Sequence, residues 1–147
     1  MNIRGFFKHD APFLSAHIQS DSLSLDSDID FLMDTGASRT VLLDKDVHFL
    51  GIDVNKLPKP EKNLGGVGGS VETHIIEDAS LSFITDEKSF EMNFPVFVLS
   101  HDLSKMSIEE RNQILRMPSL LGRDVINKFH LHLSKDKNTV LLSTDSD

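Results

Sequence analysis

Alternation of apolar and polar side chains predicts short strands along the first third of the chain. In the first of them Leu14, Ala16 and Ile18 point one way and the polar residues between them point the other, which is the two-residue period of a half-buried strand. A polar, turn-rich stretch over 20–28 is expected to connect it to the next strand. The predicted strands cover residues 11–19, 29–33 and 40–43.

The second half of the chain repeats this pattern and predicts hairpins. Apolar residues occupy mostly odd positions over 71–83 and even positions over 90–98, which indicates two facing strands above a core. Residues 129–133 and 139–142 are expected to form a further hairpin around the turn 135–138. The dominant period of two predicts an all-β fold.

Two short helices interrupt the strands. Asp44 is a candidate N-cap for a helix through about Leu50, which Gly51 could end. Ser107 and Glu110 fit a capping box at the start of a helix that runs to about Arg116.

Length and composition narrow the class of protein. The 147 residues are enough for one domain, and a hydrophobic fraction of 39% suffices for a core. The chain has no cysteine, which excludes disulfides and thiolate metal sites. A net charge of −8 argues against nucleic acid as a partner. With no long apolar run and no signal-peptide centre, we expect a soluble cytoplasmic protein without membrane contact.

Candidate chemistry first appears where an apolar run ends in a carboxylate. Phe31, Leu32 and Met33 lead directly to Asp34, where a lone charge is costly unless it is paired or protonated. Thr35 offers a hydroxyl to hold a turn, and Gly36 lets another backbone come close. An ordinary strand-end turn is the alternative interpretation.

Four glycines gather in the stretch Asn63 to Ser70. A phosphate-binding loop should continue into Lys-Ser/Thr and a helix, but an alternating strand follows here. The remaining interpretations are a plain hairpin tip and a hairpin that serves as a mobile cover, since lids need residues that absorb backbone changes. The glycines are Gly65, Gly66, Gly68 and Gly69, with Val67 between them.

A second informative stretch runs from Ser119 to Ile126. By itself it predicts a buried strand that enters a helix with glycine at the junction. The residues of interest are Leu120, Leu121, Gly122, Arg123 and Asp124.

These three stretches, in this order, resemble retropepsin-like aspartic proteases. The sequence Asp34-Thr35-Gly36-Ala37-Ser38 resembles their active-site turn, residues 64–70 their flap, and Leu120 to Asp124 the strand beside the turn. The resemblance implies a closed β-barrel with one or two short helices and one lobe per chain. It covers residues 11–142, after an N-terminal segment 1–10, with an insertion at about 101–117 and before a polar tail 143–147.

The resemblance also implies a homodimeric endopeptidase. Pepsin-like enzymes carry two such turns on a longer chain, whereas this chain contains only Asp34-Thr35-Gly36, so a dyad needs a second copy. Asp34 is then the catalytic residue, Thr35 braces the turns, Gly36 and Ala37 complete them, and Leu121 to Asp124 support them. The substrate is a peptide or protein, and no metal or other cofactor is needed.

Two departures from the family pattern matter. Viral members usually carry Asp where this chain has Ser38, which leaves Asp124 or main-chain carbonyls as alternative partners for Arg123. Ala37 lacks the hydroxyl of pepsin-like enzymes, which predicts a less acidic pH optimum than theirs.

Two rival hypotheses remain open. The fold could form a catalytically inactive dimer that binds extended peptides by main-chain pairing. Alternatively, His130 and His132 lie two apart on one strand face and could join His74 and His101 in a metal site, although zinc needs three or four ligands in suitable geometry.

Overall fold

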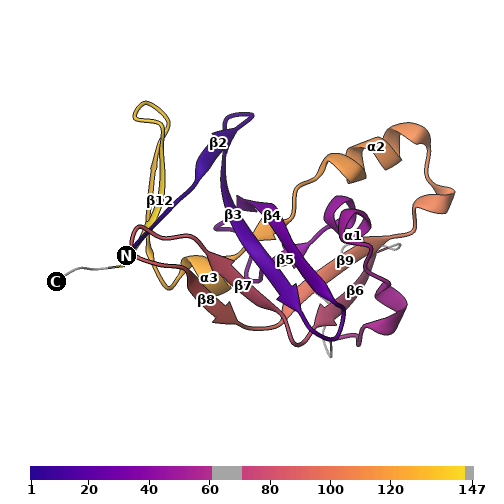
Figure 1. Ribbon diagram of the computed structural model, residues 1–147. Coiled ribbons are helices and arrows are strands. Elements are labelled where there is room, and N and C mark those ends of the chain that lie inside the picture. The colour runs from indigo at the N-terminus through magenta and orange to yellow at the C-terminus, as the bar shows by residue number, and fades with distance from the viewer. Residues whose placement is uncertain (61–70, 145–147) are drawn as a thin grey trace.

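The computed structural model describes residues 1–60 and 71–144 of the chain (Figure 1). The strands are β1 (Asn2–Arg4), β2 (Phe6–Lys8), β3 (Ala11–Ser20), β4 (Leu25–Met33), β5 (Val41–Leu42), β6 (Val71–Ile76), β7 (Ser80–Phe83), β8 (Phe90–Asn93), β9 (Val96–His101), β10 (Leu120–Leu121), β11 (His130–Ser134) and β12 (Thr139–Ser143). The helices are α1 (Asp44–Leu50), α2 (Ile108–Arg116) and α3 (Arg123–Ile126), with 3-10 turns η1 (Val54–Lys56) and η2 (Leu103–Lys105).

The strands of the described residues form two sheets. The larger sheet has the order β6-β9-β5-β10-β4-β3-β7-β8, with β2 also paired to β3, and the smaller has the order β1-β12-β11. Most neighbours are antiparallel, but β10 runs parallel to β4 and β5 runs parallel to β9. The fold is therefore mostly β with short helices, as the sequence predicts.

One long hairpin supplies both ends of the larger sheet. Its outer half pairs β6 with β9, and its inner half pairs β7 with β8. The two halves stay in contact where the Phe94 N–H donates to the Ala79 carbonyl over 3.2 Å. Because both ends of the strand order belong to one hairpin, the sheet curls around its core.

The continuous strand predicted over 71–83 is broken by a turn at Glu77 and Asp78. Before the turn Thr73, His74 and Ile76 are buried, whereas the apolar odd residues Val71 and Ile75 are only partly buried; after it the odd positions from Ala79 onward are buried, together with Ser80. The apolar pattern therefore does not mark the core in 71–76: the buried apolar residue there is Ile76, at an even position, because the turn shifts the inward-facing parity by one residue.

The polar connection predicted over 20–28 is too long, because β4 already begins at Leu25. Leu25 and Ile29 are buried, while Asp26 and Asp28 between them are exposed. Aspartate is disfavoured in strands, so the alternation was hidden by residues that usually signal turns.

The helices follow the predicted bounds, with one correction. The Ser107 hydroxyl accepts from the Glu110 N–H over 3.1 Å and caps α2, and Gly51 ends α1 at a φ of 67°. Asp44 is not the N-cap of α1: Leu43 holds that position without a side-chain bond, and the Asp44 carboxylate binds His101 instead. None of the helices in the described residues is long and apolar enough to cross a bilayer.

Residues 1–10 form β1 and β2 and pair with the rest of the fold. In β1, Ile3 lies opposite Leu142 of β12, and β2 forms a tight hairpin with β3. Figure 1 shows the N-terminus and β12 at one end of the molecule and α2 at the other.

Candidate active site

Asp34 leaves the core at the end of β4. Phe31 and Met33 are buried, at 0% and 7% exposure, while Leu32 and Asp34 on the opposite side of the strand are partly exposed. Burial of an aromatic side chain such as Phe31 stabilises a fold by about 1.5–3 kcal/mol. The buried side chains therefore fix the position of the strand in the core. On its partly exposed face, the last side chain is the Asp34 carboxylate.

Main-chain hydrogen bonds define the turn that holds this carboxylate. The Asp34 N–H donates to the Leu121 carbonyl over 3.0 Å, and the Ala37 N–H donates to the Asp34 carbonyl over 3.2 Å. The Gly36 N–H donates to Asp34 Oδ1 over 2.8 Å. Thr35 and Gly36 are exposed in the isolated chain. The turn therefore orients the carboxylate and offers an open surface beside it.

The strand β10 supports the turn from the side. Leu121 lies opposite Met33 in parallel pairing, and it is completely buried. At the next position, a Cβ on Gly122 would lie 2.5 Å from both the carbonyl carbon and the oxygen of Arg39. Only glycine allows this approach of two backbones.

Arg123 binds the turn through main-chain carbonyls. Its N–H donates to the Ala37 carbonyl over 2.8 Å, and its Nη1 donates to the Thr35 carbonyl over 2.9 Å. Of the partners considered from the sequence, the main-chain carbonyl is therefore the one in the structure. Arg123, at the start of α3, thus binds the residues immediately before and after Gly36.

Asp124 has a different partner, Thr40, which the sequence did not single out. The Thr40 N–H donates to Asp124 Oδ2 over 2.8 Å, and the Thr40 hydroxyl donates to Asp124 Oδ1 over 2.7 Å. The same hydroxyl accepts from the Gly122 N–H over 3.1 Å. Thr40 is completely buried and connects the chain after the turn to the start of α3.

A second buried polar group beside the site involves Ser119 and Asp46. The Ser119 hydroxyl donates to Asp46 Oδ2 over 2.5 Å and accepts from the Leu43 N–H over 3.0 Å. The Ser119 carbonyl accepts from the Leu32 N–H over 2.8 Å. Ser119 and Asp46 therefore attach α1 to the strands that carry Asp34, a role that their sequence neighbourhood did not reveal.

The predicted flap, residues 64–70 with Gly65, Gly66, Val67, Gly68 and Gly69, lies outside the described residues. The chain on either side of it is described. The Ile75 N–H donates to the Pro58 carbonyl over 2.9 Å, and Val71 lies opposite His101 in the β6–β9 ladder.

The histidines considered for a metal site lie with separate partners. His101 Nδ1 lies 2.5 Å from Asp44 Oδ2, and His74 is buried beside the Leu57 carbonyl and Glu72. His132 Nε2 lies 3.1 Å from the Ser143 hydroxyl. Across residues 1–60 and 71–144, no group of three or more His, Cys, Asp or Glu side chains is placed to hold a metal ion.

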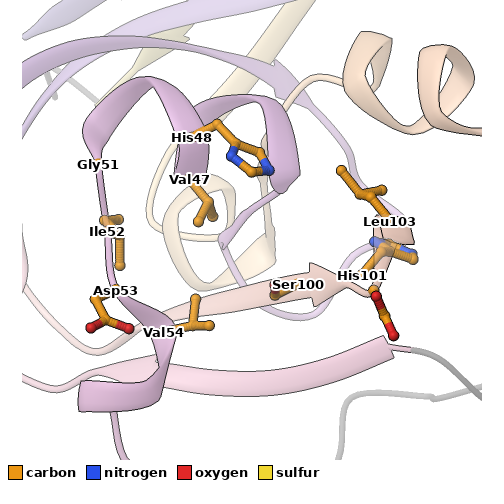
Figure 2. A pocket seen from close by; sticks show the side chains of 10 residues that line it. Val47, His48, Gly51, Ile52, Asp53, Val54, Ser100, His101 and Leu103 are labelled. Atoms are coloured by element: carbon orange, nitrogen blue, oxygen red, sulfur yellow. The ribbon is translucent and has the colours of Figure 1, made fainter. Parts of the chain in front are cut away.

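A pocket of about 480 Å³ lies away from the Asp34 turn, between α1, η1 and β9 (Figure 2). Val47 of α1 and Val54 of η1 line it, and Ser100 and His101 of β9 form its other side. The His101 ring is already bound to the buried carboxylate of Asp44. The pocket is next to the first residues of β6 and not part of the Asp34 site.

Comparison with known proteins identifies the family of the chain. The family model described as aspartyl protease matches residues 23–125, which include Asp34 and the Leu121 to Asp124 segment. The chain therefore belongs to the aspartyl protease family. No curated protein sequence gives a significant match.

Three solved structures are similar to this chain to different degrees, and the first of them shows the fold. A retropepsin-like aspartic protease from Rickettsia conorii has 24% identity and a TM-score of 0.56, covering 97% of this chain and 88% of its own. The EIAV protease complexed with the inhibitor HBY-793 has 19% identity and a TM-score of 0.45, covering 81% and 88%. The retroviral protease-like domain of Ddi1 from Leishmania major has 11% identity and a TM-score of 0.49, covering 92% and 97%. The fold is retropepsin-like, which confirms the architecture expected from the sequence.

Proposed function

We propose that this protein is a homodimeric aspartic endopeptidase in which Asp34 of each protomer forms the catalytic dyad. The observation that carries the proposal is the hydrogen-bonded turn at Asp34, held between β4 and β10 and exposed on its outer side. The chemistry of the family needs two carboxylates, but this chain carries one such turn. A second copy of the chain, related by a two-fold axis, would supply the other carboxylate.

The two-fold axis would pass beside Thr35 and Gly36. Both residues are exposed in the isolated chain, so a second copy could approach them without unfolding either protomer. Arg123 would keep the Thr35 carbonyl in place from behind while the Thr35 side chain contacts the partner. This arrangement brings the two Asp34 carboxylates together on the axis.

Proton sharing follows from that proximity. Two adjacent carboxylates do not both ionise readily, so the pair holds one proton. The ionised member takes a proton from a bound water, which attacks the scissile carbonyl, and the protonated member donates to the oxygen that gains charge. Gly36 N–H keeps one Asp34 oxygen oriented throughout.

The segment 64–70 is proposed to close over the substrate as a flap. Its glycine-rich sequence and its position directly before β6 support this role. Closure excludes water and adds main-chain contacts to an extended peptide.

A peptide-library cleavage assay from pH 3 to 8 tests the proposal. Wild type is expected to cut, and Asp34→Asn is expected to lose at least about a thousandfold of kcat/KM, because removal of the reacting carboxylate removes the water-activating group. Asp136→Asn, at the exposed β11–β12 turn, is the control with the same chemical change and should keep wild-type activity. Activity should also survive a metal chelator.

Two other results would contradict the proposal. Equal cutting by wild type and Asp34→Asn would place the activity elsewhere. No cutting by a folded, dimeric protein would favour the inactive peptide-binding dimer instead.

A further inference from the structure

A groove of about 540 Å³ lies on the same side of β4 as Asp34. Its apolar lining comes from β3, β4, the end of α2 and the residues just after it, and consists of Ala11, Phe13, Leu32, Leu115 and Pro118. Its rim is basic and comes from the end of β2, the β2–β3 turn, α1 and α2. The rim residues are Lys8, His9, Lys45 and Arg116.

Leu32 fixes the distance between this groove and the candidate catalytic carboxylate. It precedes Asp34 by two positions, and residues two apart on a strand point to the same side, about 7 Å from each other. Alternate residues of an extended peptide have the same spacing. A peptide whose scissile carbonyl lies at Asp34 can therefore place a neighbouring side chain over Leu32.

The basic rim stands out against the charge of the whole chain. The protein has 15 Lys and Arg against 23 Asp and Glu, yet the charged and titratable residues lining this groove are all basic. Within residues 1–60 and 71–144, none of the four forms a salt bridge with an acidic side chain. The Lys8 ammonium lies 5.6 Å from the centre of the Phe13 ring, which is part of the apolar lining.

The acidic residues adjacent in sequence to the rim have other partners. Asp10, beside His9 in the turn, forms a salt bridge with Lys135 at 3.0 Å. Asp44 and Asp46, on either side of Lys45, are buried and bind His101 and Ser119. The positive charges of the rim are therefore not neutralised by these neighbouring carboxylates and can attract a negatively charged group in the groove.

We propose that this groove selects substrates whose cleavage site carries an acidic side chain next to an apolar one. The apolar side chain packs on Phe13 and Leu32, and the carboxylate lies among Lys45, Arg116 and the β2–β3 turn. The inference rests on the proposed peptidase function and adds a substrate class to it. Charge complementarity favours this occupant over a second copy of the chain, which is itself acidic.

Matched peptides test the preference directly. For each position flanking the scissile bond, kcat/KM is compared between a peptide with Asp or Glu and its Asn or Gln counterpart. At one position on the groove side, wild type should cut the acidic peptide about five- to tenfold faster, as expected for two or three exposed charge pairs. The double variant Lys45→Gln/Arg116→Gln should cut both peptides alike.

Two further variants make the result specific. Lys45→Glu/Arg116→Glu should reverse the preference toward a basic side chain. Lys88→Gln, at the exposed turn between β7 and β8, removes one positive charge outside the residues that line the groove and should keep the wild-type ratio. Equal rates on acidic and amide peptides by wild type would overturn the proposal, as would a preference that survives in the double variant.

Binding to the Asp34→Asn variant separates this proposal from the peptidase proposal. The variant should bind the acidic peptide more tightly than the amide peptide, and the Lys45→Gln/Arg116→Gln changes should remove the difference.

If wild type cuts nothing but this binding preference is present, the peptidase function is wrong and the groove's selectivity stands. If cleavage depends on Asp34 but neither cleavage nor binding prefers the acid, the groove inference is wrong. A groove double variant that weakens dimerisation and leaves selectivity unchanged would assign the surface to a second copy.

Discussion

At the residue scale, the buried side chain of Thr40 connects the chain after the Asp34 turn to the start of α3. Its hydroxyl both donates to Asp124 and accepts from Gly122, and it has no access to solvent. Arg123, between those two partners, holds the carbonyls of Thr35 and Ala37. A change at Thr40 should therefore reach the Asp34 turn through one intervening residue, Arg123.

We expect Thr40→Val to lower the free energy of unfolding by about 1–3 kcal/mol, because it leaves the Gly122 N–H and one Asp124 oxygen without their buried partner. We also expect kcat/KM to fall by about tenfold or more under conditions where the variant is folded, since small displacements of reacting groups are costly. Urea unfolding and peptide cleavage measure the two effects.

Thr40→Ser keeps the hydroxyl and should restore most of the activity. Thr139→Val, whose hydroxyl binds the Lys137 carbonyl at an exposed turn, is the matched control and should change the stability by less than about 0.5 kcal/mol. Wild-type cleavage by a folded Thr40→Val variant would show that the turn does not need this hydrogen bond.

The same residues show how far the sequence predicts the site. Asp34, Gly122 and Arg123 could be identified because their residue types in a fixed local order resemble a family motif. Thr40 and Ser119 could not, because their partners Asp124 and Asp46 lie 84 and 73 positions away. A threonine or serine has no sequence signal that distinguishes a buried bridge from an ordinary strand residue.

At the scale of elements, the sequence predicts helix ends well, because they depend on local residues. It predicts less well which face of a strand points into the core. The cap of α2 and the end of α1 depend on residues within one turn, and both are as predicted. The inward face of β6 depends on a turn at Glu77 and Asp78 that shifts the register. The start of β4 was missed because its exposed face carries aspartates, which usually indicate turns; in the structure Asp28 has a cross-strand partner, His17 of β3.

That partner, His17, makes the β3–β4 ladder sensitive to pH. Its ring lies between Asp28, 2.8 Å from Nδ1, and Asp26, which contacts Nε2. Hydrogen bonds to Asp28 and then Asp26 raise the pKa of His17 above its usual value of 6.5. A raised pKa in the folded state means that the stabilisation is fully present below about pH 6.5 and is lost as the pH rises through the folded-state value.

We therefore expect His17→Gln to destabilise the protein more at pH 5 than at pH 9, because only the protonated ring compensates the two carboxylates. Urea unfolding of both proteins at pH 5, 7 and 9 measures the difference. Asp26→Asn/Asp28→Asn removes the same interaction from the other strand. It should likewise reduce the free energy of unfolding more at pH 5 than at pH 9. A destabilisation of equal size at pH 5 and pH 9 would contradict this assignment.

At the scale of the whole molecule, the proposed mechanism makes activity a property of the dimer, because each chain contributes one Asp34 turn. Mixing wild type with an equal amount of Asp34→Asn, after exchange of subunits, should lower the activity per wild-type chain to about half, because about half of the wild-type chains then have an inactive partner. Asp136→Asn in the same mixture should have no such effect. A cleavage rate that is unchanged by Asp34→Asn, at concentrations where exchange is complete, would show that each chain acts alone.

Salt should act on this assembly and on the groove in opposite directions. Each protomer carries a net charge of −8, so association brings like charges together, and raising the ionic strength from about 0.01 to 0.1 M shortens the screening length from about 30 to 10 Å. We expect the specific activity of dilute enzyme to rise over that range as dimers become more stable.

At high enzyme concentration, where all chains are dimeric, the same increase in salt should leave the rate on amide peptides unchanged and reduce the preference for acidic peptides. Measuring both peptides at both enzyme concentrations separates the two effects, since screening of assembly moves both rates together and screening of the groove changes only their ratio. If salt lowered both rates equally at high concentration, the attraction between the basic rim and an acidic substrate would not be the source of the selectivity.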